Sequence, residues 1–423
     1  MKIAFLTLGC KLNYAETATY ERGFVENGLE VVPWEDKADV YLINTCSVTE
    51  RAEKKCRNVI RKMLRVSPGA KIVVTGCYAE LRGEQIKAIE GVSLVFGAKE
   101  KTRLVADTMA MLRGGETTPD SKVPEILEAY SSEERTRSFL KVQDGCDNFC
   151  AYCTVPFARG RSRNVPIDDV VAQASRIAAA GMKEIVITGV NTGDYGRSSG
   201  ESFLDLLKRL DEVPGIERYR ISSIEPNLIT EEIIDWIASG TKFQPHFHIP
   251  LQSGSDTMLK RVGRKYDTEF FASRIDYIRS AMDPRPESPE GRLKPYVFFG
   301  IDVIAGLPGE TDELFEETYS FLKDRIRPAF IHVFPYSKRP GTRAAAWPDQ
   351  VRDSVKTERV ARLEGLCAEL HAGFVEKNRG RHSKVLWESD MKEGLMGGYT
   401  ENYIRVERPY DKSRVNEIED III

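Results

Sequence analysis

The chain has 423 residues, 41% hydrophobic positions and a formal net charge of −3 from 61 basic and 64 acidic side chains. This composition is ordinary for a globular protein and excludes fibrous, collagen-like and largely disordered classes. No apolar run reaches the roughly 18 residues that a membrane helix needs, and the short apolar N-terminus lacks a cleavage site. At roughly 100–200 residues per domain, we expect a cytoplasmic protein of several domains with no membrane partner.

The first hundred residues alternate strand-length apolar runs with helical stretches. Strands are expected at residues 2–8, 39–46, 71–77 and 93–97, and helices at 14–27, 50–65 and 79–89, with another after residue 99. Such alternation predicts a parallel sheet with helices on both faces, and we expect an N-terminal α/β domain over residues 1–113. Residues 114–137 are polar and are interpreted as a linker.

A second alternating region follows the linker, over residues 138–378. Strands are expected at 138–142, 184–190, 218–224, 246–251, 296–305 and 330–336, and helices at 167–180, 202–211, 230–239, 269–282, 312–323 and 351–378. Six β/α units in about 200 residues favour a partial (β/α) barrel, with a doubly wound open sheet as the alternative. Residues 379–423 carry short segments at 384–388, 395–405 and 417–423, which predict a small β module.

The eight cysteines indicate metal or redox chemistry, because a large cytosolic chain rarely forms disulfides. Cys146, Cys150 and Cys153 form a C-x3-C-x2-C pattern at the end of the first expected barrel strand. A structural zinc site needs four protein ligands and would have to take one from a distant residue. Three thiolates on a cubane of four irons would leave one iron open to a non-protein ligand. We therefore favour an iron–sulfur cluster over structural zinc or chance clustering.

A second set of cysteines is spread over the first domain. Cys10, Cys46 and Cys77 each end one of the first three expected strands. In open α/β sheets ligands bind beyond the carboxyl ends of the strands, so these three thiols should converge on one edge. A single such cysteine would more often be packing, but three at matching positions predict a second metal centre. Cys56 and Cys367 lie within expected helices and are interpreted as non-ligands.

Together these patterns resemble the methylthiotransferases of the radical S-adenosylmethionine superfamily, over nearly the whole chain. Gly-Cys-Lys-Leu-Asn-Tyr-Ala-Glu at 9–16 is similar to the branch that acts on threonylcarbamoyl-adenosine in tRNA. The isopentenyl-adenosine branch has Gln-Met-Asn after its first cysteine, and the ribosomal-protein branch ends its motif with Lys-Asn. Further family-like stretches lie at 188–191, 221–226, 248–255 and 300–310. The C-terminal module, residues 379–423, resembles a TRAM domain, a small RNA-binding β barrel, but ends before the strand with which such modules normally close.

The resemblance implies two 4Fe–4S clusters, one on Cys146, Cys150 and Cys153 and one on Cys10, Cys46 and Cys77. It also implies S-adenosylmethionine as both radical source and methyl donor, with the chemistry carried by the cofactors rather than by a catalytic side chain. Candidate contacts to S-adenosylmethionine are Tyr152, Gly189, Asn191, Glu225 and Gln252. The Thr-Gly-Val-Asn stretch at 188–191 departs from the usual Gly-Gly-Glu motif, which leaves an acidic contact to the amino group in doubt.

The implied partners are the anticodon loop of a tRNA, a reduced flavodoxin or ferredoxin type electron donor, and a sulfur donor. Arg159, Arg161 and Arg163 follow the cluster loop and are candidate substrate-binding residues, because a guanidinium suits a carboxylate or a phosphate. The expected activity is C2-methylthiolation of threonylcarbamoyl-adenosine at position 37. The alternatives are methylthiolation of isopentenyl-adenosine or of a ribosomal-protein aspartate, and a non-catalytic metal-stabilised RNA-binding protein.

Overall fold

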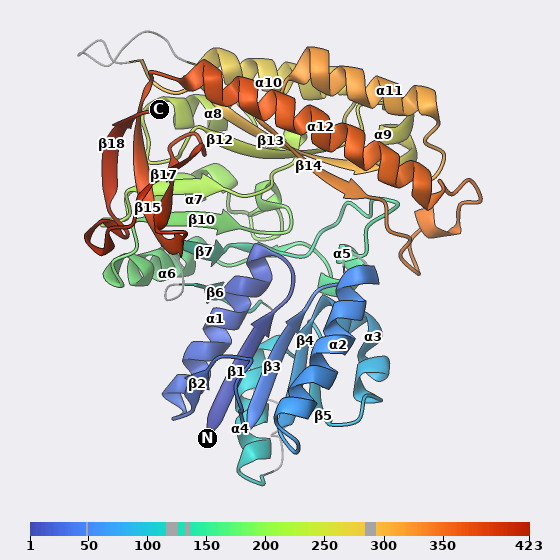
Figure 1. Ribbon diagram of the computed structural model, residues 1–423, viewed down its shortest axis with the longest axis vertical. Coiled ribbons are helices and arrows are strands. Elements are labelled where there is room, and N and C mark those ends of the chain that lie inside the picture. The colour runs from blue at the N-terminus through green and yellow to red at the C-terminus, as the bar shows by residue number, and fades with distance from the viewer. Residues whose placement is uncertain (48–49, 116–125, 132–135, 284–292) are drawn as a thin grey trace.

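The computed structural model describes residues 1–47, 50–115, 126–131, 136–283 and 293–423. Much of the expected linker at 114–137 lies outside these described residues. Figure 1 shows the N-terminal part below, the six-stranded region above it and a small C-terminal sheet at one side. No helix within the described ranges has the length and apolarity that a membrane crossing requires.

The N-terminal part is a five-stranded parallel sheet in the order β2-β1-β3-β4-β5, with helices on both faces (Figure 1). Its strands are β1 (Lys2–Thr7), β2 (Glu30–Val32), β3 (Val40–Thr45), β4 (Lys71–Gly76) and β5 (Val92–Phe96). Its helices are α1 (Lys11–Glu26), α2 (Glu50–Val66), α3 (Cys77–Lys87) and α4 (Leu104–Leu112). The expected α/β class is confirmed. The edge strand β2, which is only three residues long, was not expected from the sequence.

Strands β7, β10 and β11 form one parallel set and β12, β13 and β14 form another. An isolated bridge between Tyr219 and Phe243 joins the two sets, so the six strands follow one another in chain order as in the expected partial barrel rather than in a doubly wound open sheet. They are β7 (Arg137–Lys141), β10 (Glu184–Thr188), β11 (Arg218–Ile221), β12 (His246–Gln252), β13 (Phe298–Ala305) and β14 (Phe330–Pro335). β11 and β12 meet through the Ile224 amide, which donates to the His248 carbonyl at 3.0 Å. Short strands β6 (Ala129–Tyr130), β8 (Gln143–Asp144) and β9 (Arg163–Asn164) flank β7.

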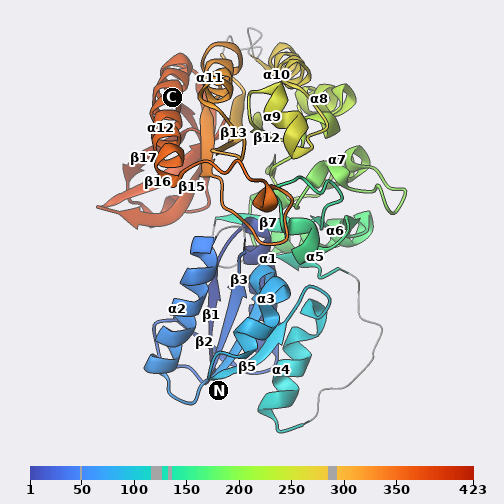
Figure 2. The ribbon, with the colours of Figure 1, turned by 90° about the vertical axis from the view of Figure 1, so that its right-hand side faces the viewer.

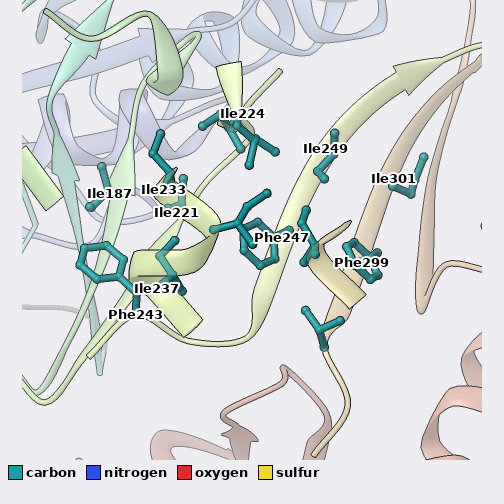
Figure 3. Close-up of a cluster of buried hydrophobic side chains, with 14 of the residues drawn as sticks. Ile187, Ile221, Ile224, Ile233, Ile237, Phe243, Phe247, Ile249, Phe299 and Ile301 are labelled. Carbon is teal, nitrogen blue, oxygen red and sulfur yellow. The ribbon is translucent and has the colours of Figure 1, made fainter. Parts of the chain in front are cut away.

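Helices cover the outer face of these strands. They are α6 (Ile167–Ala179), α7 (Phe203–Asp211), α8 (Glu231–Ala238), α9 (Asp256–Val262), α10 (Thr268–Met282), α11 (Asp312–Ser320) and α12 (Asp353–Asn378), with a π-helical turn over Phe321–Ile326. The short helix α5 (Val155–Arg159) packs instead against α3 of the N-terminal part. The short helices α5 and α9 were not expected from the sequence. Figure 3 shows the apolar core between strands and helices, with Ile187, Ile221, Phe247, Ile249, Phe299 and Ile301 among its side chains. Because side chains alternate along a strand, the intervening residues face the barrel lumen.

The C-terminal module is a four-stranded antiparallel sheet of β15 (His382–Lys392), β16 (Leu395–Thr400), β17 (Arg405–Pro409) and β18 (Ile418–Ile422). The segment expected at 395–405 is thus two strands separated by a turn. Tyr403 in that turn accepts a hydrogen bond from Arg137, and Arg220 donates to the carbonyl oxygens of Thr400 and Glu401. The turn therefore covers the end of the barrel at which the strands begin.

Buried charges join the N-terminal sheet to the barrel. Helix α1 lies on the lumen side of β7, where Ala15 packs against Phe139. The next residue, Glu16, is fully buried and lies 2.8 Å from Lys101 Nζ, 2.9 Å from Lys141 Nζ and 3.1 Å from Arg159 Nη1. Lys141 and Arg159 also bind Asp144, at 2.7 and 3.0 Å. We call these five residues, Glu16, Lys101, Lys141, Asp144 and Arg159, the interdomain charge network.

The charge network should stabilise the folded protein strongly. Burial alone would raise the pKa of the Glu16 carboxyl, but Lys101, Lys141 and Arg159 outweigh it and hold that pKa well below its ordinary value of 4.5. A carboxyl with a lowered pKa stabilises the folded state above the ordinary value and loses this contribution as the pH falls below it. The network is therefore fully stabilising at neutral pH.

We expect Glu16→Gln to lower the thermal unfolding midpoint by several degrees at pH 7. Removing one partner of a buried ion group leaves the others uncompensated, which typically costs about 3–5 kcal/mol. Differential scanning calorimetry measures the shift. The control is Lys87→Met, which breaks an ion pair with Glu84 on the surface and should change stability by less than about 1 kcal/mol. Equal midpoints for the two variants would contradict a stabilising network.

Candidate metal and cofactor site

The loop between β8 and α5 carries Cys146, Cys150 and Cys153, and backbone groups surround their sulfurs. The Asn148 amide donates to Cys146 Sγ at 3.5 Å, and the Val155 amide donates to Cys153 Sγ at 3.4 Å. The loop is fixed from both sides, because the Ala151 amide donates to the Val262 carbonyl and the Ala151 carbonyl accepts from the Ala344 amide. Such N–H···S contacts favour thiolates, so the loop is built to present charged sulfur ligands.

The same loop suits a cluster better than a single ion. Burial raises the pKa of the Cys146 thiol to about 11 and that of Cys153 to about 12, so thiolates here need a bound cation to compensate their charge. The loop supplies three sulfur ligands, one fewer than the four of a structural zinc site. Three thiolates are what a cubane of four irons takes when one iron is left open.

Arg264 lies beside this loop and was not singled out from the sequence. Its side chain is buried, donates to Cys150 Sγ at 3.4 Å and forms an ion pair with Glu225 at 2.7 Å. It also lies 3.4 Å from the Tyr152 hydroxyl. Glu225, a candidate cofactor contact, thus has its Oε1 engaged with an arginine, and the pair brings positive charge next to a ligand sulfur.

The second barrel strand ends in Gly189 and Asn191, which the structure positions through Gln143. Gln143 Oε1 accepts from the backbone amides of Val190 and Asn191, both at 2.9 Å. A Cβ on Gly189 would lie 3.0 Å from that oxygen, so glycine leaves room for the close approach. Asn191 is buried, and its Oδ1 has no hydrogen-bond partner among the described residues. It is a free acceptor at the carboxyl end of the strands, where a polar ligand could supply the donor.

A cavity of about 190 Å³ lies next to the cysteine loop. Its lining residues come from the loop, from β12 to β14 and from the segment after β14, and include Tyr152, Cys153, Gln252, Asp302, Tyr336 and Arg339. Gln252 adopts a left-handed backbone conformation, φ 72°, at an irregularity in the pairing of β12 with β13. The cavity therefore brings two predicted cofactor contacts, Tyr152 and Gln252, to the same space as Cys153.

Cys10, Cys46 and Cys77 lie along one edge of the N-terminal sheet, as the topology predicts. Thr45 and Gly76 lie opposite each other at the ends of the neighbouring strands β3 and β4. Cys46 and Cys77 directly follow these two residues, so they also lie side by side. A Cβ on Gly9 would lie 3.2 Å from Cys46 Sγ, so the Gly9-Cys10 turn lies directly against Cys46. Cys77 is the first residue of α3, and Cys10 is the N-cap of α1. Helix N-termini favour negative charge, which suits thiolate ligands.

Asn13 connects this edge to the rest of the site. Its Nδ2 donates to the carbonyl oxygens of Leu8 and Thr45, which ties β1 to β3, and its Oδ1 accepts from Arg159 Nη2 at 2.6 Å. Helix α5, which starts two residues after Cys153, packs against α3, which starts at Cys77 (Figure 2). The two cysteine triads therefore lie on opposite sides of one interface between the N-terminal sheet and the barrel.

The three arginines after the loop have different surroundings. Arg159 is buried, and its guanidinium binds Glu16, Asp144 and Asn13. The guanidinium of Arg163 donates to the carbonyl oxygens of Arg159 and Arg161. Arg161 has 81% of its side chain exposed and lies 3.4 Å from Asp147. Of the three, Arg161 is the one with an accessible guanidinium, whereas the contacts of Arg159 are internal.

Comparison with known proteins identifies the family. Residues 2–97 match the model of the uncharacterized protein family UPF0004, and residues 140–322 match the radical SAM superfamily. The chain is 41% identical to threonylcarbamoyladenosine tRNA methylthiotransferase MtaB of Bacillus subtilis, over 96% of this chain and 89% of that protein. The MtaB protein of Aquifex aeolicus is 37% identical, over 96% and 97% of the two chains. The chain belongs to the radical SAM methylthiotransferases.

Other similarities agree with this membership. A tRNA-2-methylthio-N(6)-dimethylallyladenosine synthase of Wolinella succinogenes is 34% identical, over 95% of this chain and 91% of that protein. Among solved structures, the radical S-adenosylmethionine methyltransferase TsrM of Kitasatospora setae has the same fold, with a TM-score of 0.58, 15% identity and coverage of 81% and 77%. A radical SAM methylthiotransferase uses a 4Fe–4S cluster and S-adenosylmethionine, and the cysteine loop described above fits such a cluster.

Arg264 should tune the cluster next to it. Replacing Arg264 by Met removes a positive donor from Cys150 Sγ, so the reduction potential of a cluster bound through Cys150 should become more negative. A redox titration followed by electron paramagnetic resonance, in protein whose Cys10, Cys46 and Cys77 are alanine, measures this potential alone. The control is Arg343→Met, whose guanidinium donates to the Phe149 carbonyl rather than to sulfur. Equal potentials in the two variants would rule out this role for Arg264.

Proposed function

We propose that this protein is the tRNA methylthiotransferase that converts threonylcarbamoyl-adenosine at position 37 to its 2-methylthio derivative. The observation that carries the proposal is the pair of cysteine triads on the two sides of one interface, because sulfur insertion at a C–H bond needs a radical source and a sulfur carrier close together. The MtaB names of the relatives support the substrate. When bound, the cofactors supply the radical that removes hydrogen from C2 of the adenine.

In this proposal Cys146, Cys150 and Cys153 hold the radical 4Fe–4S cluster, and Cys10, Cys46 and Cys77 hold a second cluster that carries sulfur. The Tyr152 ring packs against S-adenosylmethionine in the adjoining cavity, and Gln252 binds its polar groups. The unpartnered Asn191 Oδ1 accepts a hydrogen bond from the same cofactor, next to Gly189. Glu225 acts through Arg264, which it holds beside the cluster.

The tRNA approaches along a groove of about 840 Å³ between the N-terminal helices and the segment after β14. Its lining includes Arg82, Gln85 and Lys338, together with Glu53 and the buried Arg339, which form an ion pair. Arg339 also lines the cavity beside the cysteine loop. Basic side chains neutralise phosphates and make binding salt-dependent. Exposed Arg161 is a further proposed phosphate contact, whereas the Arg163 guanidinium donates to the carbonyl oxygens of Arg159 and Arg161 and so supports the same loop. Arg159 contributes by holding the loop that carries them.

The remaining partners also belong to the proposal. Exposed Phe149 and Phe157 stack edge to face with their centroids 5.8 Å apart, and Arg161 lies over Phe149. This aromatic and basic surface beside the cysteine loop suits the docking of a reduced flavodoxin or ferredoxin type electron donor. A separate sulfur donor replenishes the second cluster. All of these encounters take place in the cytoplasm.

A second candidate substrate is isopentenyl-adenosine in tRNA. The observation that favours it is the 34% identity to the dimethylallyladenosine synthase of Wolinella succinogenes over most of both chains. Nucleoside mass spectrometry of bulk tRNA from a deletion strain distinguishes the two substrates. We expect the 2-methylthio form of threonylcarbamoyl-adenosine to disappear while its unmodified precursor accumulates. Loss of the 2-methylthio isopentenyl nucleoside instead would establish the alternative.

Removing one ligand of the radical cluster should stop radical formation. We expect Cys150→Ala to abolish 5′-deoxyadenosine production, because the remaining two thiolates cannot hold the cluster, while about four irons stay on the other triad. Iron analysis and chromatography of the reaction products measure both effects. Cys367→Ala is the control, because that cysteine is buried against the barrel strands and its Sγ accepts from the Ile331 amide. Continued S-adenosylmethionine cleavage by the Cys150 variant would disprove the ligand assignment.

Removing two ligands of the second cluster should have a different effect. We expect the Cys46→Ala, Cys77→Ala double variant to keep measurable 5′-deoxyadenosine formation but to lose sulfur insertion, since the two triads have separate roles. The readouts are iron content, 5′-deoxyadenosine and 2-methylthio nucleoside from one reaction. An unchanged product yield with no loss of iron would reduce these cysteines to packing residues.

A further inference from the structure

Two imidazoles and a carboxylate lie together in the barrel, and no role described so far uses them. His248 Nε2 lies 2.6 Å from Asp302 Oδ1, and the rings of His248 and His332 stack with centroids 4.7 Å apart. The polar atoms of the three side chains all lie within 4.8 Å of one another. We call His248, Asp302 and His332 the lumen cluster.

The lumen cluster faces the inside of the barrel. Its members come from the adjacent strands β12, β13 and β14, where Asp302 is paired in register with His332. Their chain neighbours Phe247, Ile249 and Ile301 belong to the apolar core outside the strands (Figure 3). Side chains alternate along a strand, so the cluster points to the opposite face, into the lumen. Asp302 also lines the cavity that Cys153 and Gln252 line, so a molecule in that cavity reaches both the cysteine loop and the cluster.

The charge near the lumen cluster favours an anion over a metal ion. Lys11 follows Cys10 at the start of α1, and it interacts electrostatically with Tyr403, Arg137 and Arg220 as well as with Asp302 and His332. Burial lowers the pKa of Lys11, and the two arginines add further positive charge around it. In the described part of the chain its ammonium has no hydrogen-bond or ion-pair partner. An ammonium at this place repels a divalent cation and attracts a carboxylate. Burial lowers the pKa of His332 to about 4, so at neutral pH this imidazole is uncharged and donates one N–H.

We infer that Lys11 and the lumen cluster form the subsite that binds the polar N6 substituent of the substrate nucleoside. The inference rests on the proposed function and names the residues that read its substrate. A threonylcarbamoyl group presents a carboxylate, a hydroxyl and a ureido unit. Lys11 pairs with the carboxylate, Asp302 accepts from a hydroxyl or ureido N–H, and His332 donates to an oxygen of the same group.

This arrangement also explains how an apolar substituent would be rejected. An isopentenyl group has no polar atom, so its entry would remove water from the ammonium and the carboxylate without replacing the lost hydrogen bonds. Sites built to hydrogen-bond a substrate discriminate strongly against analogues that lack the polar group. Lys11 follows Cys10, a proposed ligand of the second cluster, and Asp302 lines the cavity beside the radical cluster. The subsite thus lies between the two proposed clusters, where the reacting base must be held.

The test measures binding of three anticodon stem-loop RNAs to the reconstituted holoenzyme by anaerobic fluorescence anisotropy. The RNAs carry threonylcarbamoyl-adenosine, isopentenyl-adenosine or unmodified adenosine at position 37. We expect the wild type to prefer the first RNA, and Lys11→Met and His332→Phe each to lose about tenfold or more of that preference, as expected for a charged or buried hydrogen bond. Affinity for the unmodified RNA and the iron content should stay the same. The matched control, Arg161→Met, should weaken all three RNAs equally.

Several outcomes would overturn the inference. Variants that keep the wild-type preference would exclude both residues from the subsite. A divalent ion other than iron that accompanies the holoenzyme and is lost in His332→Phe, measured by plasma mass spectrometry, would make the lumen cluster a metal site. A wild type that methylthiolates the threonylcarbamoyl RNA but binds all three RNAs equally would refute the subsite alone. A wild type that neither prefers nor methylthiolates that RNA would refute the proposed function as well.

Discussion

The arrangement of the site depends on one interaction, the burial of Glu16 and Asp144 among Lys101, Lys141 and Arg159. Glu16 and Lys101 come from the N-terminal part, and Asp144, Lys141 and Arg159 come from the barrel region. Lys141 and Arg159 reach Glu16 across the interface, so the full set of ion pairs forms only when the two parts are docked. An apolar contact, such as Ala15 on Phe139, is non-directional and tolerates sliding. A buried group of ion pairs does not tolerate sliding, because a small shift leaves a charge without its partner. The charge network therefore fixes the relative position of the N-terminal sheet and the barrel, and with it the relative position of the two cysteine triads.

The same contacts couple the docking of the domains to the geometry of the second triad. Arg159 reaches beyond the carboxylates to Asn13, and Asn13 in turn holds the strand ends that lead into Cys10 and Cys46. Arg159 lies in α5, which follows the loop of the first triad. One guanidinium thus connects both cysteine sets. Loss of docking would disturb the second site even though no cysteine had changed.

The cysteine patterns, the α/β class and the partial barrel could be predicted from the sequence, because short spacings and hydrophobic periodicity are local signals. The different surroundings of Arg159 and Arg161 could not be predicted. The two residues look alike in the chain, and only the position of Glu16, some 140 residues away, makes one of them internal. Similarly, the split of residues 395–405 into two strands depends on a turn that packs against Arg137 and Arg220.

The lumen cluster could be predicted from the sequence even less than the surroundings of the arginines. His248, Asp302 and His332 come from three separate strands, and no spacing in the chain links them. They meet because three parallel strands present alternate residues to one lumen. Lys11 joins them from another domain, through the docking that the charge network imposes. A motif search finds groups that are neighbours in sequence, whereas this group is defined by strand register and by domain docking.

The proposed function requires two iron–sulfur centres, one on each side of the docked interface. A crystal structure of the holoenzyme with S-adenosylmethionine, measured at the iron absorption edge, tests it most directly. We expect two separate iron peaks, one bonded to Cys146, Cys150 and Cys153 and one to Cys10, Cys46 and Cys77, with S-adenosylmethionine beside Tyr152 and Gln252 in the cavity next to the first triad. A single iron peak, or a second peak on the lumen cluster rather than on the N-terminal cysteines, would contradict it.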